Sequence, residues 1–237
     1  MAIQTTVADR HLYSVSTNFT ASTVPFSISV WINAVWNGGA RVSMVGLYNG
    51  TTTAGTTTGL QIGTSTGAGE ISCWTYGGTV MVQSATGVMT ARNNTWVNAT
   101  YTYNGTTHLI YVNGVQVGTA TTAQIAGTFT QVWINGYPPT GNANETAVFG
   151  VDAYNYYNRT LSADEVLTIY NAAGQRHGIV YGALSRYEFD ELAQGSTVVS
   201  VTDLSGNGNT LLSSGAGTAL TYNYATSFAD SNLRAPI

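Results

Sequence analysis

Residues 96–114 read WVNATYTYNGTTHLIYVNG, and this stretch decides the fold. From residue 97 to residue 103, apolar or aromatic side chains alternate with Asn and Thr, as a half-buried strand requires. The two faces carry Val97, Ala99, Tyr101 and Tyr103, and Asn98, Thr100 and Thr102. Asn104-Gly105 tolerates the positive φ of a tight turn, after which the chain returns through Val112. A β-hairpin is therefore predicted over residues 96–112.

The same alternation recurs in FSISVWI, residues 26–32. Turn signals follow at short intervals, at Asn37-Gly38-Gly39, Asn49-Gly50, Gly77-Gly78, Asn104-Gly105, Asn113-Gly114 and Asn135-Gly136. Short strands separated by such turns are typical of antiparallel sandwiches and barrels. We therefore expect an all-β fold.

One segment, near residues 162–171, is predicted to be a short helix. Ser162 can cap its start, and Glu165, three residues later, completes a capping box. Val166, Ile169 and Tyr170 then supply one apolar face.

The composition excludes several functional classes. Only 8% of the residues are charged, where ordinary domains have about 25%. All seven basic residues are arginines, so there is no lysine nucleophile, no Schiff-base lysine and no phosphate-loop lysine. The cations are too scattered for a nucleic-acid surface. No apolar run approaches the roughly 18 residues of a membrane-spanning helix.

The reactive residue types do not form a catalytic constellation. His11, His108 and His177 are far apart and have no metal-ligand spacing. Cys73 is the single cysteine and is expected to be a buried structural thiol. An enzyme is therefore not predicted, although a fold alone excludes no activity. The first residues have neither a basic start nor an apolar core, so no secretory signal is expected.

Three blocks together resemble the concanavalin A-like lectin/laminin-G-like sandwich family, in its bacterial and phage branch. FSISVWI (26–32) is similar to the family's "FTISAWV", and residues 96–114 are similar to "WHHVAATYDG…LYVNG". Residues 150–170, GVDAYNYYNRTLSADEVLTIY, resemble "IDDVRIYNRALSAEEI…LY". The resemblance implies an antiparallel two-sheet jelly-roll sandwich over residues 1–175.

The tail, residues 176–237, resembles the segment that normally opens this family. The resemblance rests on two motifs, YEFDE at 187–191 and DLSGNGN at 203–209. Residues 10–15 look like the strand that normally follows these motifs. The resemblance implies a circularly permuted order. The tail either completes its own sandwich or is donated to a neighbouring subunit, and a truncated second copy is a third alternative.

Candidate glycan-binding residues are aromatic side chains near turns or on the strand face away from the core: Trp36, Trp74, Tyr76 and Tyr137. Core aromatics are the competing explanation, and Trp31 and Trp96 occupy family positions that look structural.

Calcium is the metal that the oxygen ligands of this chain would favour. The resemblance points to Asp152, although the second acid of the family's pair is Ala153 here. Asp203 with Asn207 and Asn209 could ligate a cation, but a turn in which these side chains bond their own backbone is favoured.

These features favour a non-enzymatic structural protein of a virion, a phage capsid decoration or cement protein with a lectin-like fold. Its expected partners are further copies of itself and capsid or tail proteins, with no nucleic acid, no membrane and no obligatory cofactor. The reasons for this prediction are the neutral composition, the absent secretory signal, the missing catalytic cluster and the permuted tail. The alternative is a carbohydrate-binding module or adhesin that recognises surface glycans.

Overall fold

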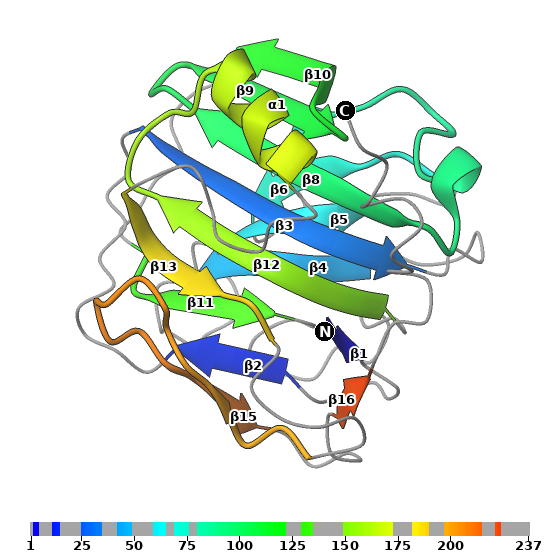
Figure 1. The fold of residues 1–237 in the computed structure, drawn as a ribbon. Coiled ribbons are helices and arrows are strands. Elements are labelled where there is room, and N and C mark those ends of the chain that lie inside the picture. The colour runs from blue at the N-terminus through cyan, green and yellow to red at the C-terminus, as the bar shows by residue number, and fades with distance from the viewer. Residues whose placement is uncertain are drawn as a thin grey trace.

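The computed structural model consists of two antiparallel sheets packed face to face, with one helix on the outside (Figure 1). This confirms the predicted antiparallel two-sheet sandwich. Each sheet has eight strands among the residues that the structure describes. These residues are 2–4, 11–14, 25–34, 42–48, 59–64, 69–75, 80–121, 129–134, 149–172, 182–189, 197–214 and 221–223.

The first sheet, sheet A, has the strand order β10-β9-β8-β3-β12-β1-β16, and β13 also pairs with β12. Its strands are β1 (Ala2–Gln4), β3 (Phe26–Ala34), β8 (Trp96–Tyr103), β9 (Thr107–Val112), β10 (Val115–Thr121), β12 (Phe149–Tyr157), β13 (Ala183–Tyr187) and β16 (Thr221–Asn223). The predicted hairpin is β8 and β9, in which Tyr103 pairs with His108. Asn113 and Gly114, between β9 and β10, both have positive φ, as a tight turn of this type requires.

The second sheet, sheet B, has the order β14-β15-β2-β11-β4-β5-β6-β7. Its strands are β2 (His11–Ser14), β4 (Val42–Tyr48), β5 (Gly59–Thr64), β6 (Ser72–Thr75), β7 (Val80–Gln83), β11 (Gln131–Ile134), β14 (Ser200–Val201) and β15 (Leu211–Ser214). A short 3-10 helix, η1 (Thr90–Arg92), precedes β8.

The core between the sheets is rich in aromatic rings. The ring of Phe26 lies 5.6 Å from that of Tyr101, 6.0 Å from that of Tyr156 and 6.3 Å from that of Phe129. The apolar face predicted for β8 is buried here, since its residues are at most 1% exposed. Alternation therefore identified the core face of this strand correctly.

The polar face of β8 is also buried, unlike that of a half-exposed strand. Asn98 and Thr100 are 0% exposed. The Asn98 amide donates to Ser29 Oγ at 3.2 Å, and the Thr100 hydroxyl donates to the same oxygen at 3.0 Å. These bonds satisfy polar groups that burial would otherwise leave without partners. The outer face of sheet A is thus a hydrogen-bonded layer.

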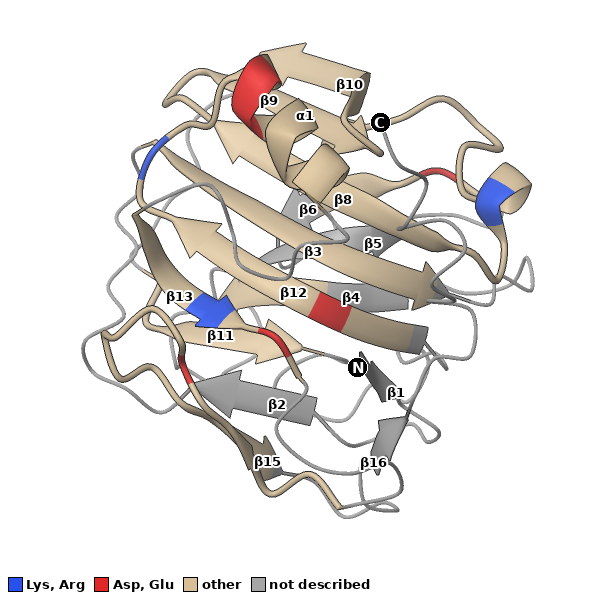
Figure 2. Ribbon diagram, viewed as in Figure 1, with Lys and Arg blue, Asp and Glu red and all other residues tan. Residues whose placement is uncertain are grey.

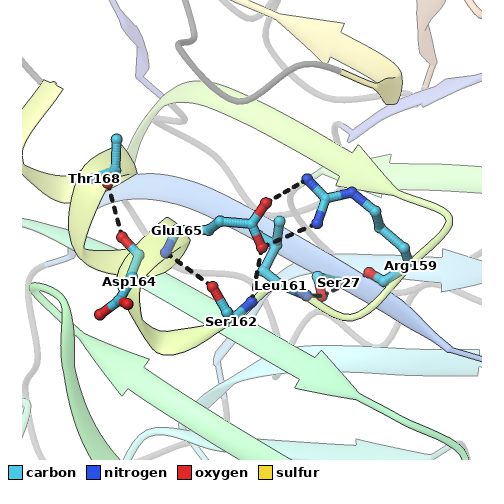
Figure 3. A network of polar contacts seen from close by, with 7 residues as sticks. All are labelled: Ser27, Arg159, Leu161, Ser162, Asp164, Glu165 and Thr168. Atoms are coloured by element: carbon cyan, nitrogen blue, oxygen red, sulfur yellow. Dashed lines mark hydrogen bonds and ion pairs between the residues drawn. The ribbon is translucent and has the colours of Figure 1, made fainter.

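Helix α1 (Ala163–Asn171) lies over this outer face and confirms the predicted helix (Figure 3). Ser162 Oγ accepts from the Glu165 N–H, and Glu165 Oε2 accepts from the Ser162 N–H, which completes the capping box. Arg159 donates to both carboxylate oxygens of Glu165, at 3.0 and 2.7 Å. Its hydrogen bonds are the main cause that lowers the pKa of Glu165 to about 2. No helix in the described part of the chain is long and apolar enough to cross a bilayer.

The tail strands pair within the same chain. Residues of β13 pair with β12, those of β15 with β2, and those of β16 with β1. Along one side of β12, Tyr187 pairs with Tyr154 and Ile3 pairs with Val151. The end of β13 therefore points toward the start of β1, so the two short strands follow one another along the same neighbour.

Candidate functional site

One of the four sequence-predicted glycan residues lies in a described strand. Trp36, Tyr76 and Tyr137 lie outside the described residues, and Trp74 lies in β6. Three successive antiparallel pairings separate β11 from β6, so these two strands run in opposite directions. The last residues of β11 and β6 therefore lie at opposite ends of sheet B. The four positions remain predictions.

A cross-strand row on the outer face of sheet B contains Trp74. Trp133 of β11 pairs with Gly46 of β4, Gly46 pairs with Gln61 of β5, and Gln61 pairs with Trp74 of β6. Directly paired residues share a face of the sheet. Val132 and Ile134, on either side of Trp133, belong to the core, so this row faces away from it. We call Trp133, Gly46, Gln61 and Trp74 the sheet B row.

Trp133 lies at one end of the sheet B row and is nearly buried. Its indole Nε1 donates to Gln131 Oε1 at 3.0 Å, and its side chain is 7% exposed. Gly46 has no side chain, so its partner's aromatic ring can lie over the backbone there. Three strand spacings separate Trp133 from Trp74, which is about 14 Å. The row thus spans a width suited to an extended ligand.

Trp133 is a residue that the sequence analysis missed. The signal was present, because QVWI at 131–134 alternates in the same way as the run that begins at Phe26. What the sequence did not show is the register that aligns Trp133 with Trp74, since 55 residues and three strand pairings lie between β6 and β11.

Asp152 lies on the outer face of sheet A, opposite Trp31 in the register of β12 with β3. It is 5% exposed, and its Oδ1 accepts from the Ala153 N–H at 2.8 Å. Ala153 has a φ of 45°, in the left-handed region that disfavours a Cβ. No group of three or more His, Cys, Asp or Glu gathers anywhere in the described part of the chain. The six to eight oxygen ligands of Ca²⁺ would need further donors, so calcium at Asp152 stays a prediction.

Asp203 organises a turn, as the sequence analysis favoured over a cation site. Its Oδ1 accepts from the N–H groups of Arg186 and Ser205, at 3.0 and 2.9 Å. Its Oδ2 accepts from the Ser205 hydroxyl and the Asn209 N–H, at 2.8 and 2.9 Å. Four hydrogen bonds therefore occupy the carboxylate and tie the turn to β13.

Buried titratable groups lie between the sheets. Tyr101 Oη and His108 Nδ1 are 2.7 Å apart, and the His108 ring stacks on Tyr103 at 4.4 Å. Cys73 is buried as predicted, and burial raises the pKa of its thiol well above the usual value. A thiol with a raised pKa is a poor nucleophile at neutral pH.

Comparison with solved structures places this architecture among lectin-like folds. A Bacteroides ovatus protein named as a candidate carbohydrate binding protein is 14% identical with a TM-score of 0.60, and the match covers 94% of this chain and 61% of that chain. The heptameric SAP-like pentraxin of Limulus polyphemus is 12% identical with a TM-score of 0.55, over 91% and 94% of the two chains. Trypanosoma rangeli sialidase in complex with sialic acid is 12% identical with a TM-score of 0.51, over 65% of this chain and 24% of that chain.

At these identities the structural likeness shows the fold alone. No curated protein sequence matches this chain. The model of the concanavalin A-like lectin/glucanases superfamily matches residues 8–167, which include most strands of both sheets. This chain therefore belongs to the concanavalin A-like lectin/glucanases superfamily.

Proposed function

We propose that this chain binds carbohydrate and that the sheet B row is the binding surface. The observation that carries the proposal is the register that aligns Trp133, Gly46, Gln61 and Trp74 across four adjacent strands. Aromatic faces bind the apolar faces of sugar rings, and amide groups bind their hydroxyls. Gln61 and Trp74, one residue of each kind, are directly paired in the row.

The location of the row on a rigid sheet supports this proposal. Trp133 is oriented by its hydrogen bond to Gln131, and Val132 and Ile134 anchor β11 in the core. A side chain that is held in place before binding loses little conformational freedom when a ligand arrives. The B. ovatus protein, which shares the fold, is named for carbohydrate binding, and that agrees with the proposal.

The proposal is tested by affinity electrophoresis in native gels that contain a soluble glucan, galactan or mannan. At least one polysaccharide should retard the protein, and Trp74→Ala or Gln61→Ala should weaken the retardation by roughly tenfold or more in apparent affinity. Val199→Ala, an exposed substitution outside the row, is the matched control and should leave mobility unchanged. Equal retardation of all variants would contradict the location, and no retardation by any glycan would contradict the function.

We also propose that the chain is a virion protein, a capsid decoration or tail component that associates with copies of itself and with particle proteins. The low charge of the chain supports this, because neutral contacts between subunits depend little on salt. Val199 is 70% exposed beside β14, a strand at the end of sheet B. Quantitative mass spectrometry of purified particles tests the proposal, since hundreds of copies would indicate decoration and absence would overturn it.

The role of residues 176–237 is part of the same proposal. β13 and β15 pair with strands β12 and β2, and a donated tail would use the same strand edges in a neighbour. Deletion of residues 178–237 should therefore unfold the domain or abolish its assembly. A stable truncated chain that assembles like the full chain would contradict this role.

A further inference from the structure

The outer face of sheet A has its own tryptophan platform, formed by Trp96, Asn33 and Gly150. Trp96 of β8 pairs with Asn33 of β3, and Asn33 pairs with Gly150 of β12. A Cβ on Gly150 would lie 2.8 Å from Trp96 Cη2 and 3.0 Å from Trp96 Cζ2. The indole therefore crosses the middle strand and lies over the glycine two strands away.

The exposure of the platform residues differs. Gly150 is buried under the ring, whereas the Trp96 side chain itself is only partly buried. Trp96 occupies a position expected to be structural, and covering Gly150 is such a role. Trp96 is thus less buried than the glycine that it covers.

Helix α1 borders the platform. Trp31, two residues before Asn33 on the same face, stacks on Tyr170 of α1 with a centroid distance of 5.8 Å and an interplanar angle of 19°. Tyr170 is partly exposed, and Trp31 is 7% exposed. The Trp31–Tyr170 pair therefore lies outside the platform, between it and the helix, in a region where Figure 1 shows β3, β8 and β12 side by side.

The polar groups at the platform define the chemistry of a ligand. Asn33 is partly exposed and carries both a donor and an acceptor. Asp152 follows Gly150 by two residues on the same face. It is the one charged residue in the two paired rows Trp96–Asn33–Gly150 and Asn98–Trp31–Asp152. Figure 2 shows few charged residues on the strands of this sheet. Asp152 is 5% exposed, so its carboxylate acts on a ligand through its negative charge, which disfavours anions. The groups therefore suit an uncharged sugar.

We propose that an uncharged pyranose stacks on Trp96 at this platform, which makes it a second binding surface on the face opposite the sheet B row. The inference rests on the proposed carbohydrate-binding function. The outer faces of a two-sheet sandwich point in opposite directions, with the sheets about 10 Å apart. One chain therefore engages two glycan strands at once and can bridge them without forming an oligomer.

Isothermal titration calorimetry tests this proposal, with a neutral oligosaccharide chosen from glucan, galactan and mannan series. The wild-type chain should bind two oligosaccharides per molecule, and Trp96→Phe should reduce the number to one. Gly150→Ala keeps the tryptophan but forces its ring off the floor, and it should have the same effect. Trp31→Phe is the matched control, because Trp31 is stacked under Tyr170, and it should keep both sites.

The outcomes separate the two proposals. Binding at a single site that Trp74→Ala abolishes and that folded Trp96→Phe and Gly150→Ala leave unchanged would overturn the second surface and leave the function in place. No heat of binding with any oligosaccharide would overturn the function itself. Thermal unfolding followed by circular dichroism identifies which variants are folded, and a folded Gly150→Ala protein decides the matter if Trp96→Phe does not fold.

Discussion

Replacing Ser27 by alanine tests how the strand core holds the helix-bearing segment. Ser27 is 0% exposed and lies in β3. Its hydroxyl donates to the Arg159 carbonyl at 2.9 Å and accepts from the Leu161 N–H at 2.9 Å (Figure 3). More than 130 residues of sequence separate the partners, so this one hydroxyl joins β3 to the entry of α1.

The expected cost follows from what the substitution leaves behind. Ser27→Ala removes two hydrogen bonds and leaves the buried Leu161 N–H without its acceptor. A buried donor that loses its partner costs about 1–3 kcal/mol. For a domain of this size each kcal/mol lowers the melting temperature by roughly 2–4 °C. We therefore expect Ser27→Ala to melt about 4–8 °C below the wild-type chain, for a cost near 2 kcal/mol.

Differential scanning fluorimetry and urea unfolding, followed by tryptophan fluorescence, measure this loss. Thr168→Ala is the control, because its hydroxyl also bonds to a backbone carbonyl, that of Asp164, but at an exposed position. It should change stability by at most about 0.5 kcal/mol, as exposed substitutions usually do. Equal melting temperatures for the two variants would refute the argument that Ser27 anchors the segment.

Three further predictions concern charge, thiol reactivity and backbone strain. The lowered pKa of Glu165 means that its ion pair with Arg159 stabilises the fold above about pH 4.5 and is lost as the pH falls toward 2. The urea midpoint of the wild-type chain should therefore fall over this pH range, and Glu165→Gln should make that fall smaller. An equal fall in the two proteins would contradict this. Cys73 should not react with a disulfide reagent at pH 8 in the folded chain, because the thiol is buried and burial raises its pKa. It should react fully in guanidinium. Rapid reaction of the folded chain would show an accessible thiol. Ala153→Gly should raise the free energy of unfolding by about 1 kcal/mol, and with it the urea midpoint, because glycine relieves the positive φ. A lower midpoint would argue against strain there.

Local sequence patterns were sufficient for the hairpin and for the helix. Alternation from Val97 to Tyr103 depends only on the two-residue period of a strand, and Asn104-Gly105 supplies the turn. Ser162 and Glu165 lie within one helical turn, so a capping box is visible in the sequence itself. The family resemblance, which rests on the order of such blocks, was confirmed for residues 8–167.

Burial of the second strand face was beyond the reach of alternation. Asn98 and Thr100 read as solvent-facing residues, but α1 and the segment before it lie on the face to which they belong. Whether a polar face is exposed depends on what packs over it, and here that element is more than 60 residues away in the chain. Ser29 and Asn98 then supply the hydrogen bonds that the covered face needs.

The sequence by itself determined the strand and helix types, the buried thiol and the superfamily, because each depends on neighbouring residues or on a conserved order of blocks. Only the tertiary structure decided that Trp74 shares a row with Trp133, and that Trp96 lies over Gly150. These contacts depend on the register of strands that are distant in sequence. A shift of one residue in any pairing would move a side chain to the opposite face, so a binding surface on a sheet is set by register rather than by motif.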